Sequence, residues 1–130
     1  MKITWMRCNS YEEARNHTRI IYLHEWDGKP FYWGKVVNSY FGGSKRKRDG
    51  VQISPRYGLS YRHWIEGCLQ HGGALYIGKL DEEGKGRIGE VENYLIRTYG
   101  HKMNREVKAP LSPLQIEHEG DVPQSVSKRG

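Results

Sequence analysis

Two runs of strand-forming residues on either side of a short turn constrain the fold of this chain more than any other feature. Residues 19–25 and 29–37 are rich in β-branched and aromatic side chains, and Trp26-Asp27-Gly28 separates them. Such runs around an Asp-Gly pair predict a β-hairpin. We expect a three-residue turn with Gly28 in the left-handed conformation, that is, a type I turn followed by a bulge.

The length of this turn decides which residues face each other. A three-residue turn pairs Glu25 with Lys29 and, further from the turn, Tyr22 with Tyr32. A two-residue turn would shift the register by one and place the two tyrosines on opposite faces. We therefore expect Tyr22 and Tyr32 to share one face of the sheet, with both hydroxyl groups pointing toward Arg62 and Glu92.

Capping residues predict two helices in the first half of the chain. Ser10 followed by Glu13 is a capping box, which predicts a short helix over residues 10–16. Ser54-Pro55 combines an N-cap serine with a proline at the first helical position, so it predicts the start of a helix. That helix is expected to run to about Gln70, where glycines follow.

Hydrophobic spacing predicts the elements of the second half. Residues 74–80 are expected to form a third strand and residues 81–86 a polar turn. Apolar residues then recur at helical spacing over residues 88–100. The order β-β-α-β-α predicts a small α/β (α+β) domain with a three-stranded, largely antiparallel sheet flanked by helices.

The length of the chain, 130 residues, suits one domain of ordinary size. We expect residues 1–112 to form this domain, with a basic loop over residues 38–54. Prolines recur among Ser, Gln, Glu and Gly beyond this point, so residues 113–130 are predicted to be a poorly ordered C-terminal tail.

The charge of the chain favours an anionic partner. Lys and Arg number 21 against 15 Asp and Glu, which gives a net charge of +6 with neutral histidines. No apolar run approaches the ~18 residues of a membrane span, and no secretory signal is expected. Two cysteines, Cys8 and Cys68, are typical of reduced thiols, so we expect a cytoplasmic protein without membrane attachment.

Four short motifs occur in an order that resembles a known family. Ile20-Ile21-Tyr22 and, after nine intervening residues, Tyr32-Trp33-Gly34-Lys35 are similar to the paired signature of the GIY-YIG nuclease superfamily. Leu59-Ser60-Tyr61-Arg62 is similar to the family's Leu-x-x-Arg helix. Glu92-Asn93-Tyr94-Leu95-Ile96 resembles its Glu-x-x-Leu-Ile motif, and Asn104 follows twelve residues after Glu92. The resemblance covers residues 20–104.

The resemblance implies metal-dependent hydrolysis of phosphodiester bonds. It assigns Tyr22 as the general base or the residue that orients water, and Tyr32 as a hydrogen-bond donor to the phosphate or water. Because a free tyrosine has a pKa of ~10, Tyr22 needs a nearby cation, which Lys35, Arg62 or the metal would supply.

The remaining implied roles concern the phosphate and the metal. Arg62 would hold the scissile phosphate through its planar guanidinium group. Glu92 resembles the family's single metal ligand, a carboxylate suited to Mg²⁺ or Mn²⁺ with water in the other positions. Asn104 is similar to a support residue that positions the last helix or a phosphate.

The chain departs from the family pattern at one important position. Four residues after the arginine the family has His or Tyr, whereas this chain has Glu66, with His63 and His71 nearby. Either the helix aligns differently by a turn, or another histidine, such as His63, takes this role. Arg56 is the second choice for the catalytic arginine, because it lies seven residues before His63 on one helical face.

These features together predict a metal-dependent DNA endonuclease, restriction-like and acting preferentially on double-stranded DNA. The loop and helix residues expected to contact DNA phosphates are Lys45, Arg46, Lys47, Arg48 and Arg56. Cutting both strands would require a homodimer or two visits. Two alternatives keep the same fold: a nucleic-acid-binding module with a degenerate site, and a structure-specific or single-strand repair nuclease.

Overall fold

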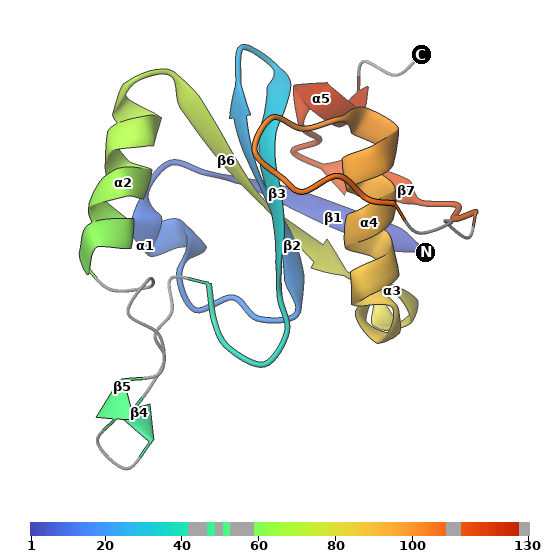
Figure 1. Cartoon of the computed structure of the whole chain (residues 1–130), viewed down its shortest axis with the longest axis horizontal. Coiled ribbons are helices and arrows are strands. Elements are labelled where there is room, and N and C mark those ends of the chain that lie inside the picture. The colour runs from blue at the N-terminus through green and yellow to red at the C-terminus, as the bar shows by residue number, and fades with distance from the viewer. Residues whose placement is uncertain (42–46, 49–50, 53–58, 109–112, 128–130) are drawn as a thin grey trace.

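The computed structural model describes residues 1–41, 47–48, 51–52, 59–108 and 113–127. Its elements occur in the following order (Figure 1): β1 Lys2–Cys8, α1 Tyr11–Ala14, β2 Ile20–Trp26, β3 Lys29–Val36, β4 Lys47–Arg48, β5 Val51–Gln52, α2 Leu59–Gln70, β6 Gly73–Leu80, α3 Glu82–Gly86, α4 Ile88–Tyr99, β7 Glu117–Gly120 and α5 Gln124–Ser127. The fold class is α+β, as the sequence predicts.

The main sheet has five strands in the order β3-β2-β6-β1-β7. The three predicted strands, β2, β3 and β6, are mutually antiparallel neighbours. The prediction of a three-stranded sheet was nevertheless wrong, because β1 adds antiparallel to β6 and β7 adds parallel to β1. Residues Lys2 to Trp5 alternate between polar and apolar side chains, and Ile3 and Trp5 are buried, which is the pattern of a strand with one face in the core.

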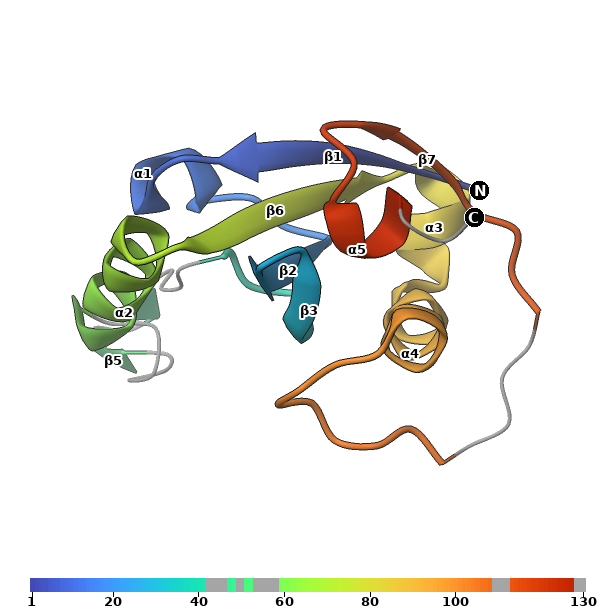
Figure 2. The same cartoon turned by 90° about the horizontal axis from the view of Figure 1, so that it is seen from above.

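Helices cover both faces of the sheet and form two hydrophobic clusters. On one face, Ile65 of α2 packs with Ile20, Tyr22, Leu75 and Ile77. On the other face, α4 packs with the alternate residues of the same strands; this cluster includes Val91, Leu95, Ile96, Ile21, Leu23 and Trp33. Figure 2 shows α2 and α4 on opposite sides of the sheet. Because β3 is the edge strand at one end of this sheet, its outer edge borders both faces.

The helices begin and end largely where capping residues predict. The Ser10 side chain accepts a hydrogen bond from Glu13 N and begins α1. The predicted start of α2 at Ser54-Pro55 lies outside the described residues, and α2 ends at Gln70 as predicted. Residues 81–86 are not a simple polar turn, because the Asp81 side chain accepts from Gly84 N and begins the short helix α3. No helix in the described ranges is both long and apolar enough to span a membrane.

Part of the predicted basic loop forms local structure. Lys47–Arg48 pairs antiparallel with Val51–Gln52, so β4 and β5 form a small two-stranded sheet within residues 38–54. Residues 42–46, 49–50 and 53–58 lie outside the described part of the chain.

The prediction of a poorly ordered tail was wrong for residues 113–127. Leu114 and Val126 are buried in the cluster on the α4 face. Trp5 Nε1 donates to His118 Nδ1 at 3.0 Å, and Ser125 Oγ donates to a Glu25 carboxylate oxygen at 2.6 Å. Apolar residues spaced among the prolines and polar residues are enough to dock this segment.

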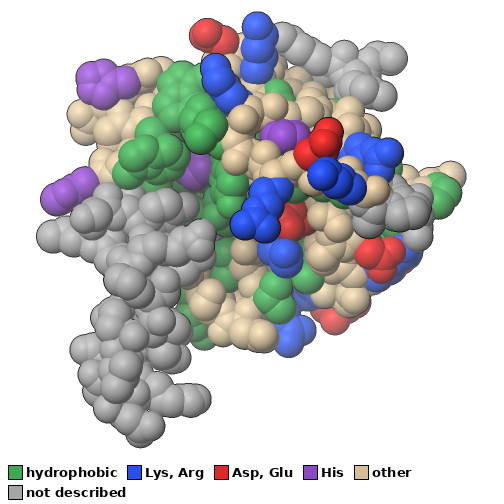
Figure 3. Space-filling view, in the orientation of Figure 1, with side chains coloured by type: hydrophobic (Ala, Val, Ile, Leu, Met, Phe, Trp, Pro, Cys, Tyr) green, Lys and Arg blue, Asp and Glu red, His purple; other side chains and the backbone are tan. Residues whose placement is uncertain are grey.

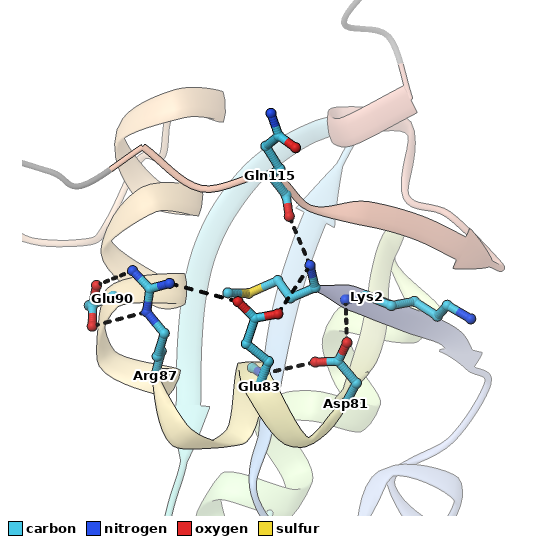
Figure 4. Close-up of polar contacts among 8 residues, drawn as sticks. Lys2, Asp81, Glu83, Arg87, Glu90 and Gln115 are labelled. Atoms are coloured by element: carbon cyan, nitrogen blue, oxygen red, sulfur yellow. Dashed lines mark hydrogen bonds and ion pairs between the residues drawn. The ribbon is translucent and has the colours of Figure 1, made fainter.

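Polar contacts join the first residue to α3 and to the C-terminal segment (Figure 4). The Met1 amino group donates to Gln115 O at 3.0 Å and lies 3.6 Å from a Glu83 carboxylate oxygen. The second oxygen of the Asp81 carboxylate accepts from Lys2 N at 2.8 Å. One carboxylate thus caps α3 and fixes the start of β1.

Candidate functional site

The turn between β2 and β3 is shorter than the sequence predicts. Trp26 pairs with Lys29, so Asp27 and Gly28 alone connect the strands. Both have positive φ, 52° and 71°, as a two-residue type I′ turn requires. The prediction of a three-residue turn was therefore wrong, because Asp27 tolerates the left-handed conformation that had been assigned to Gly28 alone.

A bulge next to this turn restores the expected arrangement of the tyrosines. Between His24 and Glu25 the register shifts, so that His24 pairs with Tyr32 and Tyr22 with Gly34. The extra residue on β3 is Phe31. The shorter turn shifts the register by one residue and the bulge shifts it by one more. Side chains alternate between faces with a period of two, so the two shifts together leave Tyr22 and Tyr32 on the same face, with ring centroids 6.1 Å apart.

The ring of Tyr22 lies across Gly34 in the middle of this face. A Cβ atom at Gly34 would overlap Tyr22 Cζ and would lie 2.5 Å from the hydroxyl oxygen. Phe41 packs edge-on against the same ring at 4.9 Å, and Tyr22 is only 6% exposed. Tyr22 is thus held in one position by its neighbours.

Glu92 lies on the opposite face of the sheet from Tyr22. It belongs to α4, and its Oε1 accepts from Lys35 Nζ at 3.0 Å. Lys35 follows Gly34 on β3, so its side chain belongs to the other face. The expectation that both tyrosine hydroxyl groups point toward Glu92 was wrong for Tyr22, because α4 covers the face that Tyr22 does not occupy. A common site must extend around the β3 edge.

Asn104 binds the main chain of β3 at this edge. Its Oδ1 accepts from Trp33 N at 2.8 Å, and its Nδ2 donates to Trp33 O at 2.7 Å. The side-chain amide thus makes the two hydrogen bonds with Trp33 that the main chain of a neighbouring strand would otherwise make. Because both of its ends are engaged, this geometry favours a positioning role for Asn104 over direct contact with a phosphate.

A cavity of about 510 Å³ at the β3 edge brings several predicted residues together. We call it the edge cavity; its lining includes Tyr32, Glu92 and Asn104, together with Asn93 and Glu106. Glu92 is only 14% exposed there, whereas its partner Lys35 is 39% exposed. Glu92 therefore offers a half-buried carboxylate to the cavity and pairs with a more exposed lysine beside it. Arg105 and Lys108 line the same cavity as Glu92 and Glu106, so its lining carries charges of both signs.

Arg62 and His63 lie on α2, on the Tyr22 side of the sheet. Arg62 Nη2 is 3.4 Å from a Glu12 carboxylate oxygen, and its guanidinium carbon lies 5.3 Å from the centroid of the Tyr11 ring. Arg62 is 43% exposed, and His63 is exposed. Neither residue lines the edge cavity as described.

Glu66 has a structural contact in place of the family's His or Tyr. Its carboxylate accepts from Tyr11 N at 2.9 Å, at the first residue of α1. An acidic group at this position satisfies a free N–H group of the helix start. Of the residues predicted to contact DNA, Lys45, Arg46 and Arg56 lie outside the described residues, and Lys47 and Arg48 form β4.

One residue next to the candidate site was not assigned from sequence. His24 is 2% exposed, and its ring packs edge-on against Tyr22 at 5.7 Å and Trp64 at 5.0 Å. Burial lowers the pKa of His24 to about 4. Its spacing of two residues from Tyr22 on one strand was the available signal, because such residues share a face.

The acidic residues of the edge cavity offer oxygen ligands to a hard cation. Glu92 and Glu106 supply carboxylates and Asn93 an amide oxygen, which suits Mg²⁺ or Mn²⁺. Within the described ranges, no group of three or more His, Cys, Asp and Glu residues is arranged to hold a metal ion. Any metal at Glu92 would therefore take several of its ligands from water or substrate.

No protein-family model matches this chain, and neither a curated protein nor a solved structure matches it significantly.

Proposed function

We propose that this protein is a divalent-metal-dependent DNA endonuclease whose site extends around the β3 edge. The observation that carries this proposal is the edge cavity, in which Tyr32, Glu92 and Asn104 lie together and Lys35 contacts Glu92. These residues come from segments far apart in the chain, and each matches a motif of the resemblance to GIY-YIG nucleases. The net charge of +6 is consistent with a phosphate-bearing substrate.

Each residue has a chemical role in this proposal. Glu92 would hold Mg²⁺ or Mn²⁺, with Glu106 in reach of the same cavity. A bound divalent ion stabilises negative charge on the phosphoryl oxygens and the leaving oxygen. Tyr32 would donate to the phosphate, and Asn104 would keep β3 in place through the Trp33 main chain.

The residues on the α2 face would act from the other side of the edge. Tyr22, held next to Tyr32, would orient the attacking water. Arg62 would have to exchange its contact with Glu12 for a phosphate oxygen, which is a small cost because the pair is exposed. The proposal therefore requires the substrate to bridge α2 and β3.

A cleavage assay with matched glutamate variants tests this function. Supercoiled plasmid is incubated with the parent protein, Glu92→Gln and Glu90→Gln, in Mg²⁺, Mn²⁺ or EDTA. Glu90 lies on the same helix but pairs with Arg87 at 2.7 Å, outside the edge cavity. We expect the Glu92 variant to lose several orders of magnitude in rate because the metal acts in the transition state. The Glu90 variant should cleave like the parent.

DNA affinity of Glu92→Gln should hold or rise, because a carboxylate repels a nearby phosphate. Equal cleavage by the parent and Glu92→Gln would remove Glu92 from the proposed machinery. Discrete plasmid bands would indicate a restriction-like enzyme, and sedimentation of the protein with and without DNA would test for a homodimer.

A second function, a nucleic-acid-binding module without catalysis, is favoured by two contacts. Glu66 caps α1 where the family has a catalytic His or Tyr, and Lys35 occupies one oxygen of Glu92. This alternative predicts DNA binding by the parent but no cleavage in any divalent metal. The same assay therefore separates the two functions.

A further inference from the structure

A second cavity lies next to the candidate site and has a different character. It has a volume of about 490 Å³ and is lined by three aromatic residues, Trp26, Phe31 and Trp64, and by Lys29, Lys102 and Asp27. We call it the aromatic groove. Figure 3 shows hydrophobic side chains gathered between α2 and the β2–β3 hairpin, with Lys and Arg side chains beside them. Its volume is within the ~300–1,000 Å³ of pockets that hold small organic groups.

The aromatic side chains are fixed in place, although Trp64 is 43% exposed. Trp26 and Phe31 pack edge to face with centroids 5.0 Å apart, and Trp26 Nε1 donates to His71 O at 3.4 Å. The ring of Trp64 rests edge-on against the buried His24. An exposed indole held by such contacts offers a flat surface to a ligand at little cost in side-chain entropy.

The charges beside the rings favour an anionic ligand. Lys29 and Lys102 are exposed, and within the described part of the chain neither forms an ion pair with a carboxylate. Asp27 is the one acidic residue among those that line the groove as described, and its carboxylate would repel a phosphate placed directly beside it. The combination of flat aromatic surface and two lysines is complementary to a base attached to a phosphate chain.

The groove adjoins the edge cavity along β3. Phe31 lines the groove and the next residue, Tyr32, lines the edge cavity. Phe31 O accepts from Lys102 N at 3.1 Å and from Met103 N at 3.0 Å, and Asn104 follows in the edge cavity. A strand positioned for cleavage at the edge cavity would therefore have neighbouring nucleotides at the groove.

We propose that the aromatic groove binds unpaired bases of a DNA strand adjacent to the phosphate that is cleaved. This inference rests on the proposed nuclease function for the position of the phosphate. Stacking on Trp64 requires an open base face, which a continuous duplex does not offer because neighbouring bases cover it. The substrate class is therefore single-stranded DNA, or a duplex with a gap, flap or mismatch that exposes bases.

The test is a binding measurement in EDTA, so that it does not depend on cleavage. The parent protein is titrated against a labelled single strand of thymidines and an abasic strand of the same length, which has the same phosphates but no bases. We expect the abasic strand to bind about 5- to 150-fold more weakly for one stacked base. Equal affinity for the two strands would overturn the proposal without any variant being needed.

Variants then locate the contact. Trp64→Ala should bring the ratio of the affinities for the thymidine strand and the abasic strand close to one. Trp64→Phe should retain most of this preference because a ring remains. Lys29→Ala and Lys102→Ala should each make the negative slope of log K against log salt shallower by ~0.7. The control is Lys79→Ala, which removes an exposed lysine of β6 outside the groove.

The outcomes separate this proposal from the nuclease function. A base preference that persists in a folded Trp64→Ala protein would place the stacking site elsewhere and overturn the assignment. A preference for the base-bearing strand without cleavage in any metal would support base binding at the groove and contradict the nuclease function. Cleavage of plasmid without a preference for the base-bearing strand would support the nuclease function and contradict base binding at the groove.

Discussion

The ring of Tyr22 occupies the space that a Cβ atom would need on Gly34, its partner on the neighbouring strand. Glycine at this position is therefore required by the tyrosine across the strand pair, independently of any catalytic role. Both residues lie in the segments that resemble the paired GIY-YIG signature, and in this chain the contact is a packing reason for a glycine opposite the tyrosine.

Gly34→Ala should displace Tyr22 and destabilise the protein by ~1–3 kcal/mol, the usual cost of an overpacked core position. Urea unfolding measures the change. In the background of Tyr22→Ala the same substitution should cost much less, since the overlap no longer exists. The control is Gly67→Ala in α2, where an added Cβ meets no atom within 4 Å. Equal costs of Gly34→Ala with and without Tyr22 would contradict the contact.

Lys35→Met should make the edge cavity bind a divalent cation more tightly. Lys35 contacts Glu92 at 3.0 Å and competes with a metal for the same carboxylate. We expect the Mg²⁺ concentration for half-maximal cleavage to fall by up to roughly fivefold, the factor that corresponds to ~1 kcal/mol for a partly exposed ion pair. Unchanged Mg²⁺ dependence with lower stability would mean that the pair only joins β3 to α4.

Asn104→Ala should destabilise the protein by ~1–3 kcal/mol, because Trp33 N and Trp33 O would lose their partners at the β3 edge. Chemical denaturation measures this loss. Asn93→Ala, in the same cavity but without a described bond to the main chain, is the matched control. A stable Asn104→Ala protein that has lost cleavage alone would instead support direct contact with the phosphate.

His24 should make the protein less stable as the solution becomes mildly acidic. Burial lowers its pKa in the folded state to about 4, whereas the unfolded chain has the ordinary value of ~6.5. The unfolded state therefore binds the proton first, and stability falls as pH decreases from ~6.5 toward 4, by roughly 3 kcal/mol in total. Unfolding at a series of pH values should show this slope, and His24→Phe should make it shallower; burial also lowers the pKa of His118, which contributes a slope of the same sign. An imidazolium NMR signal for His24 at pH 6 in the folded protein would rule the explanation out.

Asp81 should make the stability of the folded protein depend on pH in more acidic solution as well. Hydrogen bonds from Gly84 N and Lys2 N lower the pKa of its carboxyl group, so the folded state holds the charged form more strongly than the unfolded state. The resulting stability is present above the ordinary carboxyl pKa of ~3.9 and is lost as pH falls through the lower folded value. Asp81→Asn should flatten this slope. Glu82→Gln, which removes a carboxylate of α3 that pairs with Lys85, should leave it unchanged.

The central strands and longer helices were predictable because their hydrophobic spacing is local. The bulge at Phe31 was not, because the pattern of β-forming residues is the same for a three-residue turn and for a two-residue turn followed by a bulge. The choice depends on how Tyr22 packs over Gly34 and on Ser125, which binds Glu25 next to the bulge.

The parts that were missed depend on distant partners. The strand β7 consists of Glu117, His118, Glu119 and Gly120, none of which favours a strand, and only its pairing with β1 defines it. The cap that Glu66 provides to Tyr11 joins residues 55 positions apart. The resemblance named Tyr32, Glu92 and Asn104, which line one cavity, but it did not indicate that the sheet separates Glu92 from Tyr22.

The position of β1 between β6 and β7 has a consequence for how the protein folds. The hairpin and its neighbour β6 pair over moderate sequence separations, but Lys2 must meet Glu117, 115 positions later. Contacts of such long range are formed at a high cost in loop closure, so they slow folding and come late. During synthesis, β1 can pair with β6 once residue 80 has emerged, but its other edge waits for β7 until nearly the whole chain is made. This unpaired edge of β1 is where aggregation of the nascent protein is most to be expected.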